Sequence, residues 1–312
     1  MTAPLHPQTQ LYLDRLHSLG ALSTYRFSPS EAKEGFESMV LSGGPPEPLA
    51  SVEDRTVPGP NGNIPVRIYT PEGDGPFGVL QYMHGGGWEV GSRFAYDPVC
   101  RTIAYRAKCV VVSVDYRLTP EFVYPVQVNE CYSVLQWIAE YARTFRGDPA
   151  RIAVGGDSAG GNLTAVMTLK ARDERGPTLK FQFLIYPVTD YCQPESASYQ
   201  EFANQYFLTA RDMKNFFDLY LPHGFDRDDP HIFPLRAKDL SNLPPALIIN
   251  ADHDVLLDDG VAYANRLKQA GIPVQHTIYP GIIHTFINLR GQLDQSNVAH
   301  DEIAAALRAA FA

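Results

Sequence analysis

The stretch GGDSAGGN, residues 155–162, decides the fold of this chain. It follows the short apolar run at residues 152–154 and precedes a segment with helical spacing at residues 163–170. A strand, a tight corner and a helix in this order expose the side chain of Ser158 at the top of a sheet, above the helix N-terminus, in the geometry of a nucleophile elbow. Glycines at such a corner also serve close packing alone, so a catalytic role needs support from other parts of the chain.

The composition allows a large buried core and provides no basic surface for nucleic acid. The chain has 312 residues, of which 45% are hydrophobic, and a net charge of −9. Binding to a phosphate backbone needs clustered lysine and arginine, and the sequence has no such cluster, so we exclude nucleic acid as a partner. The longest apolar runs, such as residues 110–114, are far shorter than the roughly 20 residues of a spanning helix, so we expect no membrane span.

The start of the sequence and the cysteines favour a cytoplasmic protein. The first residues, MTAPLH, lack the basic and apolar regions of a secretory signal. The four cysteines have neither the Cys-x-x-Cys spacing of a metal or redox site nor the density of a secreted disulfide scaffold. We therefore predict free, buried thiols at Cys100, Cys109, Cys131 and Cys192.

Short strands alternate with helices along most of the chain. We predict strands at residues 51–57, 64–69, 79–83, 110–114, 152–155, 181–186, 246–250 and 274–279. Predicted helices between them lie at residues 98–107, 127–141, 163–172 and 258–270. Apolar strands separated by helices favour the α/β class, here an eight-stranded, mostly parallel sheet with helices on both faces.

The N-terminal part and a later insertion differ from this alternation. Residues 7–19 carry leucines at helical spacing, and SPSE at residues 28–31 is a capping box that opens a second helix to about residue 41. Residues 189–228 are rich in aromatic side chains, and Thr209 caps a helix there. We predict a helical cap from residues 1–50 and 188–228, over the sheet edge where ligands bind, and an α/β core from residues 51–187 and 229–312.

The stretch HGGGW, residues 84–88, offers hydrogen-bond donors. It directly follows a predicted strand, and its three consecutive glycines leave backbone N–H groups free to face a ligand. The alternative is a loop that needs glycine only for positive φ angles, but the preceding histidine and the elbow downstream favour an oxyanion hole. The N–H of the residue after the serine would complete it. The predicted donors are Gly85, Gly86, Gly87 and Ala159.

An acidic loop follows the predicted strand at residues 246–250. Asp258 and Asp259 begin a helix and are explained as complements of its dipole. Asp252 and Asp254 both lie in the loop at the end of the strand, where the acid of a catalytic triad is expected. The residues themselves do not decide between these two aspartates.

His284 follows the last predicted strand and so lies on the same rim of the sheet as Ser158. Of the other histidines, His276 lies inside a strand, His253 abuts the aspartates, and the rest fall in helices or cap segments. Position therefore favours His284 as the general base. The order serine, aspartate, histidine is the one that α/β-hydrolases use, unlike chymotrypsin and subtilisin.

Together these motifs resemble those of the hormone-sensitive-lipase family, the bacterial family IV esterases with the α/β-hydrolase fold. The resemblance rests on HGGGW at residues 84–88, DYRLTPE at 115–121, GDSAGGN at 156–162, residues 254–260 and His284, and it covers nearly the whole chain. It implies that Ser158 is the nucleophile and His284 the base. It also implies that the acid is Asp254 and not Asp252.

Two positions depart from the family pattern. Val255 stands where the family usually has proline, and Thr285 where it usually has glycine. Neither position carries a catalytic group. Because Thr285 adjoins His284, its larger side chain bears on the shape of the pocket wall.

The resemblance implies a carboxylesterase that cleaves small-molecule esters with short to medium acyl chains through an acyl-enzyme, with no metal or organic cofactor. Its rivals are an amidase with the same triad and a non-hydrolytic binding protein on the same fold, as in plant gibberellin receptors, which lack the triad histidine. The oligomeric state is open, a homodimer included. For the apolar lining of the pocket, with core packing as the alternative at each position, we select Trp88, Phe207, Leu208, Ile283 and Phe286.

Overall fold

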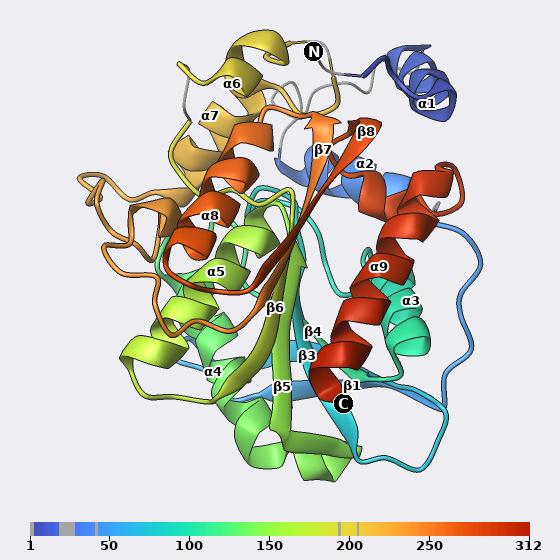
Figure 1. Ribbon diagram of the computed structural model, residues 1–312, viewed down its shortest axis with the longest axis vertical. Coiled ribbons are helices and arrows are strands. Elements are labelled where there is room, and N and C mark those ends of the chain that lie inside the picture. Colours follow the sequence, from blue (N-terminus) through green and yellow to red (C-terminus); the bar gives the residue numbers. More distant parts are fainter. Residues whose placement is uncertain (1–2, 19–28, 41–42, 193–194, 205) are drawn as a thin grey trace.

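An eight-stranded sheet forms the centre of the molecule (Figure 1). The computed structural model describes residues 3–18, 29–40, 43–192, 195–204 and 206–312. The strands lie in the order β1-β2-β4-β3-β5-β6-β7-β8; β2 is antiparallel to both neighbours and the other pairs are parallel. The predicted α/β fold is confirmed. The strands are β1 (Ser51–Val57), β2 (Ile64–Thr70), β3 (Phe77–Met83), β4 (Val110–Val114), β5 (Gly147–Asp157), β6 (Leu179–Ile185), β7 (Ala246–His253) and β8 (Val274–Ile283).

Helices cover both faces of this sheet (Figure 1). One face carries α3 (Asp97–Ala107) and α9 (Asp294–Phe311). The other face carries α4 (Val126–Tyr141), α5 (Ala159–Asp173) and α8 (Leu257–Gln269). Short 3-10 helices lie at Ala142–Phe145, Pro234–Arg236 and Phe286–Asn288.

The apolar strands follow from this two-sided burial. Successive side chains of a strand point to opposite faces. In β4, Val110 and Val112 pack into the layer of α4, and Val111 packs into the layer of α3. All five residues of this strand are buried, which explains why its sequence is apolar without alternation.

The remaining helices lie at the end of the sheet toward which β7 and β8 point (Figure 1). They are α1 (Pro7–Ser18), α2 (Pro29–Val40), α6 (Ala197–Glu201) and α7 (Ala210–Tyr220). The predicted cap of α7 is confirmed, because the Thr209 hydroxyl accepts from the Asp212 N–H and the Asp212 carboxylate accepts from the Thr209 N–H. Ser28, the cap predicted for α2, lies outside the described residues.

The strand ends differ from the predicted ones where neighbouring strands extend the pairing. β8 continues through Pro280 and Gly281 because His253 at the end of β7 pairs with Ile283. This extension delivers His284 directly from the end of a strand. The sequence reasoning also missed α9, whose buried side chains Ile303, Ala304 and Leu307 face the sheet. Among the helices of the described ranges, none combines the length and the apolar character needed to cross a membrane.

Candidate active site

Ser158 occupies a strained corner between β5 and α5. Its φ of 56° and ψ of −119° lie in a region that side-chain-bearing residues rarely adopt. The backbone of the neighbouring strand β3 passes very close: a Cβ on Gly160 would lie 2.0 Å from the carbonyl oxygen of Met83, and one on Gly156 would lie 2.4 Å from it. The glycines of this stretch therefore serve both close packing and the exposure of Ser158 in the predicted elbow.

A chain of hydrogen bonds runs from Ser158 to Asp254. Ser158 Oγ lies 2.9 Å from His284 Nε2, and His284 Nδ1 lies 2.6 Å from Asp254 Oδ2. The other carboxylate oxygen of Asp254 accepts the Leu256 N–H at 2.9 Å, which fixes the plane of the carboxylate. All three groups of the chain are buried. A carboxylate, an imidazole and a hydroxyl in this arrangement can remove a proton from the serine during nucleophilic attack.

Asp252 is separated from this chain by its own partners. Its Oδ1 lies 2.7 Å from His253 Nδ1 and accepts the N–H of Ile282 at 3.1 Å. Asp252 thus ties the end of β7 to the extended β8. The geometry decides what the residues alone left open, because Asp254 alone of the two aspartates bonds to His284.

Gly86 and Gly87 line the cavity beside Ser158, and Ala159 directly follows the serine. In the described chain, the N–H groups of Gly86, Gly87 and Ala159 donate no hydrogen bond to the protein. Gly86 and Gly87 have φ angles of 112° and 60°, which glycine adopts without strain. These three N–H groups are therefore available as hydrogen-bond donors.

Gly85 is a correction to the predicted set of donors. Its N–H donates to Asp157 Oδ1 at 3.0 Å and so is not free to bind an oxyanion. A Cβ at this position would lie 2.4 Å from Asp157 Oδ2, so the glycine is needed for close approach to the carboxylate. The sequence could not reveal this, because the partner is 72 residues away in the chain.

His84, the first residue of the glycine loop, packs into the core. It is fully buried and stacks on Tyr116, with ring centroids 4.3 Å apart. Burial lowers the pKa of its imidazole. His84 therefore packs as a neutral ring below the glycines and does not reach the triad.

A small cavity of about 40 Å³ opens beside Ser158. Phe207 and Leu208 line it, as predicted from the sequence. Sequence reasoning missed several other lining residues, which come from α2, the loop after the glycines, the end of β5 and α7. The missed lining residues are Phe36, Val90, Tyr96, Asp157, Asp212 and Phe216, whereas Thr285, which was expected to shape the pocket wall, also lines the cavity.

Three of the predicted pocket residues are core residues instead. Trp88 is fully buried and stacks on Tyr220, with centroids 4.1 Å apart. Phe286 is fully buried against Tyr186, and Ile283 is fully buried at the end of β8. None of the three lines the cavity.

Thr285 adopts a left-handed conformation directly after His284. Its φ of 70° and ψ of 0° are costly for a β-branched residue, by roughly 1 kcal/mol or more. The glycine that the family usually has here avoids this cost. Thr285 also lines the cavity, so its side chain narrows the space beside His284.

Comparison with known proteins places this geometry in a family. Residues 80–288 match the family model described as the alpha/beta hydrolase fold. The chain belongs to the α/β-hydrolase family, in the hormone-sensitive-lipase branch. This α/β-hydrolase is 42% identical over 270 residues to the carboxylic ester hydrolase LipN of Mycobacterium tuberculosis. The match covers 85% of this chain and 72% of that protein.

Two further relatives match over nearly their whole length. The ethyl acetate hydrolase of Pseudomonas putida is 34% identical, over 94% of this α/β-hydrolase and 95% of the relative. An ester hydrolase from the metagenome of Lake Arreo, solved with a derivative of bipyridine phosphonate, superimposes with a TM-score of 0.94. It is 38% identical, and the match covers 98% of this chain and 99% of that chain.

Proposed function

We propose that this α/β-hydrolase is a serine carboxylesterase. The observation that carries the proposal is the line of hydrogen bonds from Ser158 through His284 to Asp254, at 2.9 and 2.6 Å. Relatives named as carboxylic ester hydrolase and ethyl acetate hydrolase support the same reaction class. The intact His284 weighs against a binding protein that has lost its catalytic base.

Catalysis follows from the contacts of the three side chains. As Ser158 Oγ attacks the ester carbonyl, its proton passes to His284 Nε2. Asp254 accepts the Nδ1–H of the same ring, which holds the imidazole in the required tautomer and stabilises the imidazolium. His284 then protonates the leaving alcohol, and later activates the water that releases the acid from Ser158.

The tetrahedral intermediate places a negative charge on the former carbonyl oxygen. The free N–H groups of Gly86, Gly87 and Ala159 can donate to this oxygen, and Ala159 is also the first residue of α5, so the helix dipole adds to the stabilisation. Because these N–H groups have no protein acceptor among the described residues, no hydrogen bond has to break when the charge develops.

The narrow cavity favours short acyl chains. Phe207, Leu208 and Phe216 wall a space of about 40 Å³ beside the nucleophile. Apolar pockets discriminate each methylene by about 1–3 kcal/mol. We therefore propose acetate and propionate esters as the best substrates, with activity falling as the acyl chain lengthens.

Turnover of aryl esters of increasing acyl length, together with the matched acetanilide, tests this function. We expect kcat/KM to be highest for the acetate or propionate ester and at least about 100-fold lower for the anilide, whose leaving group is poorer. Comparable rates on the ester and the anilide would make the protein an amidase. No turnover of any ester would favour a binding protein.

Phe216 is expected to limit the acyl length. A Cβ on Gly87 would lie 2.4 Å from its ring, so the side chain closes the pocket against the glycine loop. Phe216→Ala removes this wall and should raise the kcat/KM ratio of hexanoate to acetate esters by about tenfold or more. The measurement is a chain-length profile of the variant.

Phe217→Ala is the matched control for this experiment. Phe217 neighbours Phe216 on α7 but packs against Trp88, at a centroid distance of 5.6 Å, and does not line the cavity. We expect a lower melting temperature and an unchanged chain-length profile. Equal profiles for the two variants would contradict the role of Phe216.

The organisation of the chain and its location belong to the same proposal. The helices at residues 7–18, 29–40, 197–201 and 210–220 would form the cap, and the sheet with its flanking helices the core. A cytoplasmic location is supported by the free thiols of all four cysteines, since thiols stay reduced in that compartment. Sedimentation equilibrium of the purified chain tests whether it forms a homodimer.

A further inference from the structure

A second buried carboxylate adjoins the triad and has no part in the mechanism above. Asp157 directly precedes the nucleophile, is 2% exposed and lines the cavity. Its Oδ1 accepts the Tyr82 hydroxyl at 2.8 Å and the Gly85 N–H at 3.0 Å, and its Oδ2 accepts the Tyr96 hydroxyl at 3.0 Å. Three donors from the chain thus converge on one carboxylate beside the site of reaction.

The contact with Gly85 orients the oxyanion loop. The peptide of Gly85 leads directly into Gly86 and Gly87, which line the cavity beside Ser158. Because the Gly85 N–H is bonded to Asp157, the following peptides leave the contact in a defined direction. Asp157, which directly precedes the nucleophile, therefore also fixes the position of the loop whose N–H groups are proposed to bind the oxyanion.

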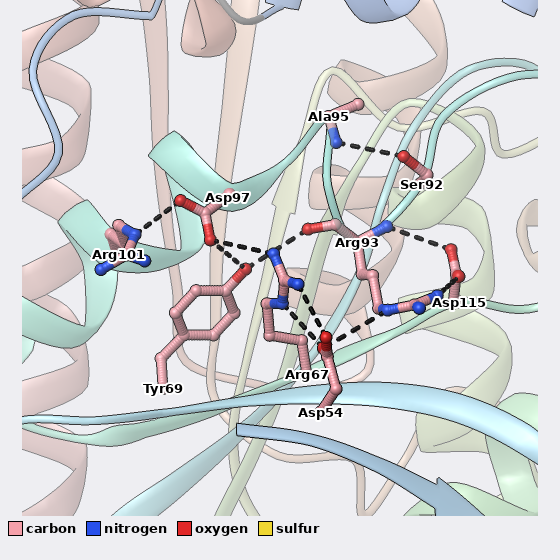
Figure 2. A network of polar contacts seen from close by, with 9 residues as sticks. All are labelled: Asp54, Arg67, Tyr69, Ser92, Arg93, Ala95, Asp97, Arg101 and Asp115. Carbon is pink, nitrogen blue, oxygen red and sulfur yellow. Dashed lines mark hydrogen bonds and ion pairs between the residues drawn. The ribbon is translucent and has the colours of Figure 1, made fainter. Parts of the chain in front are cut away.

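Tyr96 reaches Asp157 from a loop that is itself held in place. Figure 2 shows the polar network that anchors residues 92–97. On one side of Tyr96, Arg93 pairs with Asp115, and its backbone N–H donates to the same carboxylate at 3.0 Å. On the other side, Asp97 accepts from Arg67 at 3.3 Å and from the hydroxyl of Tyr69 at 3.2 Å.

The ring of Tyr96 is also confined by packing. It lies 5.4 Å from the ring of His84 and 6.3 Å from that of Phe36, which belongs to α2. Its hydroxyl therefore points at Asp157 with little freedom. The charged network that holds residues 92–97 therefore also fixes the Tyr96 hydroxyl. Through Asp157, this hydroxyl helps to fix the Gly85 N–H of the oxyanion loop.

We propose, on the basis of the proposed function, that Asp157 is a positioning residue of this esterase. It holds the Gly85 peptide so that the N–H groups of Gly86 and Gly87 face the oxyanion. Tyr96 fixes Asp157 for this role. Among the described residues, the side chain of Asp157 bonds to Tyr82, Gly85 and Tyr96 and to no member of the triad. It acts through the loop.

The surroundings of Asp157 connect this role to pH. Burial raises the pKa of its carboxyl group to about 6, while the hydroxyls of Tyr82 and Tyr96, the nearby imidazole of His284 and the Gly85 N–H oppose the rise. Protonation would remove the charge that the Gly85 N–H binds, so loop positioning should weaken as pH falls through this value. The titratable groups that face Asp157 are Tyr82, Tyr96, Cys100, Tyr116, Tyr186 and His284.

Asp157→Asn tests the proposal, because the amide keeps the size of the side chain but accepts more weakly. We expect kcat per active site to fall by about 10- to 100-fold with little change in KM, since the oxyanion forms only after substrate binds. The inhibition constant of a trifluoromethyl ketone, whose adduct with Ser158 carries an oxyanion, should rise by a similar factor. The acid limb of the pH–kcat profile should move to lower pH, because the amide does not titrate.

Tyr96→Phe and Tyr263→Phe complete the experiment. Tyr96→Phe removes only the hydroxyl that holds Asp157 and should lower kcat by about three- to tenfold. Tyr263 is buried on α8 in a different cluster of the core, so its Phe variant should retain the wild-type kcat. Active sites are counted by phosphonate labelling of Ser158, which separates turnover from the folded fraction.

The outcomes distinguish this role from a structural one. If Asp157→Asn and Tyr96→Phe lower the melting temperature but keep kcat per active site and the ketone inhibition constant within twofold of the wild type, the proposal is wrong. Wild-type turnover is the reference for every variant. A wild-type protein without esterase activity would therefore overturn the proposed function, and not the role of Asp157 alone.

Discussion

Ser158→Ala is expected to lower kcat on an aryl acetate by about 10⁴- to 10⁶-fold, the usual cost of removing a catalytic serine. The reason is chemical. Among the described residues, Ser158 has the only hydroxyl that bonds to His284, whose other ring nitrogen bonds to Asp254. Without the nucleophile, substrate binding and the proposed oxyanion hole should leave a residual acceleration of about 10³- to 10⁴-fold over water.

The fold should tolerate this substitution. Ser158 donates its backbone N–H to the carbonyl of Ile185 at 2.9 Å, and alanine keeps that bond. We therefore expect an unchanged circular dichroism spectrum and a melting temperature close to that of the wild type. A phosphonate should label the wild type at Ser158 and leave the variant unlabelled. Wild-type turnover in a folded Ser158→Ala variant would exclude Ser158 as the nucleophile.

Asp254→Asn is expected to lower kcat by about 10⁴-fold, because an amide cannot hold the imidazole in the tautomer that accepts the serine proton. Asp254 Oδ2 lies 2.6 Å from His284 Nδ1, and the amide nitrogen of asparagine would favour a proton on Nε2 instead. The Leu256 N–H, which bonds to the other oxygen, keeps its acceptor. The loss should therefore appear in kcat and leave the fold intact.

The chain provides a matched control for this substitution at Asp252. The same change there weakens the contacts with His253 and with the Ile282 N–H, which both end on Oδ1 and join β7 to β8, because an amide oxygen accepts less strongly than a carboxylate. We expect Asp252→Asn to lower the melting temperature and to reduce kcat by less than about tenfold. If Asp252→Asn proved as inactive as Asp254→Asn, or if Asp254→Asn kept more than about a tenth of wild-type kcat, the assignment of the acid would be wrong.

Much of the fold could be predicted because its signals are local. The strands Ser51–Val57 and Val110–Val114 begin and end at the predicted residues. Strand extensions could not be predicted in the same way. β8 continues past Pro280 because it pairs with β7 across the sheet, and a pairing partner is invisible in a single stretch of sequence.

The pocket shows the same limit more strongly. Trp88, Ile283 and Phe286 adjoin catalytic motifs in the sequence, and yet all three are packed into the core. Phe36 and Phe216 lie far from every motif in the sequence, and the fold brings both to the nucleophile. Adjacency along the chain says little about which way a side chain points once helices pack over a sheet.

The sequence by itself determined the chemical groups and the local backbone of the site: a serine at a glycine-lined corner, consecutive glycines after a strand, and a histidine after the last strand, in the order of an α/β-hydrolase. Only the tertiary structure decided which groups meet. Ser158 and His284 are 126 residues apart in the chain but 2.9 Å apart in space, Asp254 bonds to His284 where Asp252 does not, and Gly85 bonds to Asp157 instead of a substrate. The physical reason is that a hydrogen bond forms only when the distance between its two atoms is correct to within a few tenths of an ångström. The packing of the whole sheet sets these distances, and no local sequence pattern encodes them.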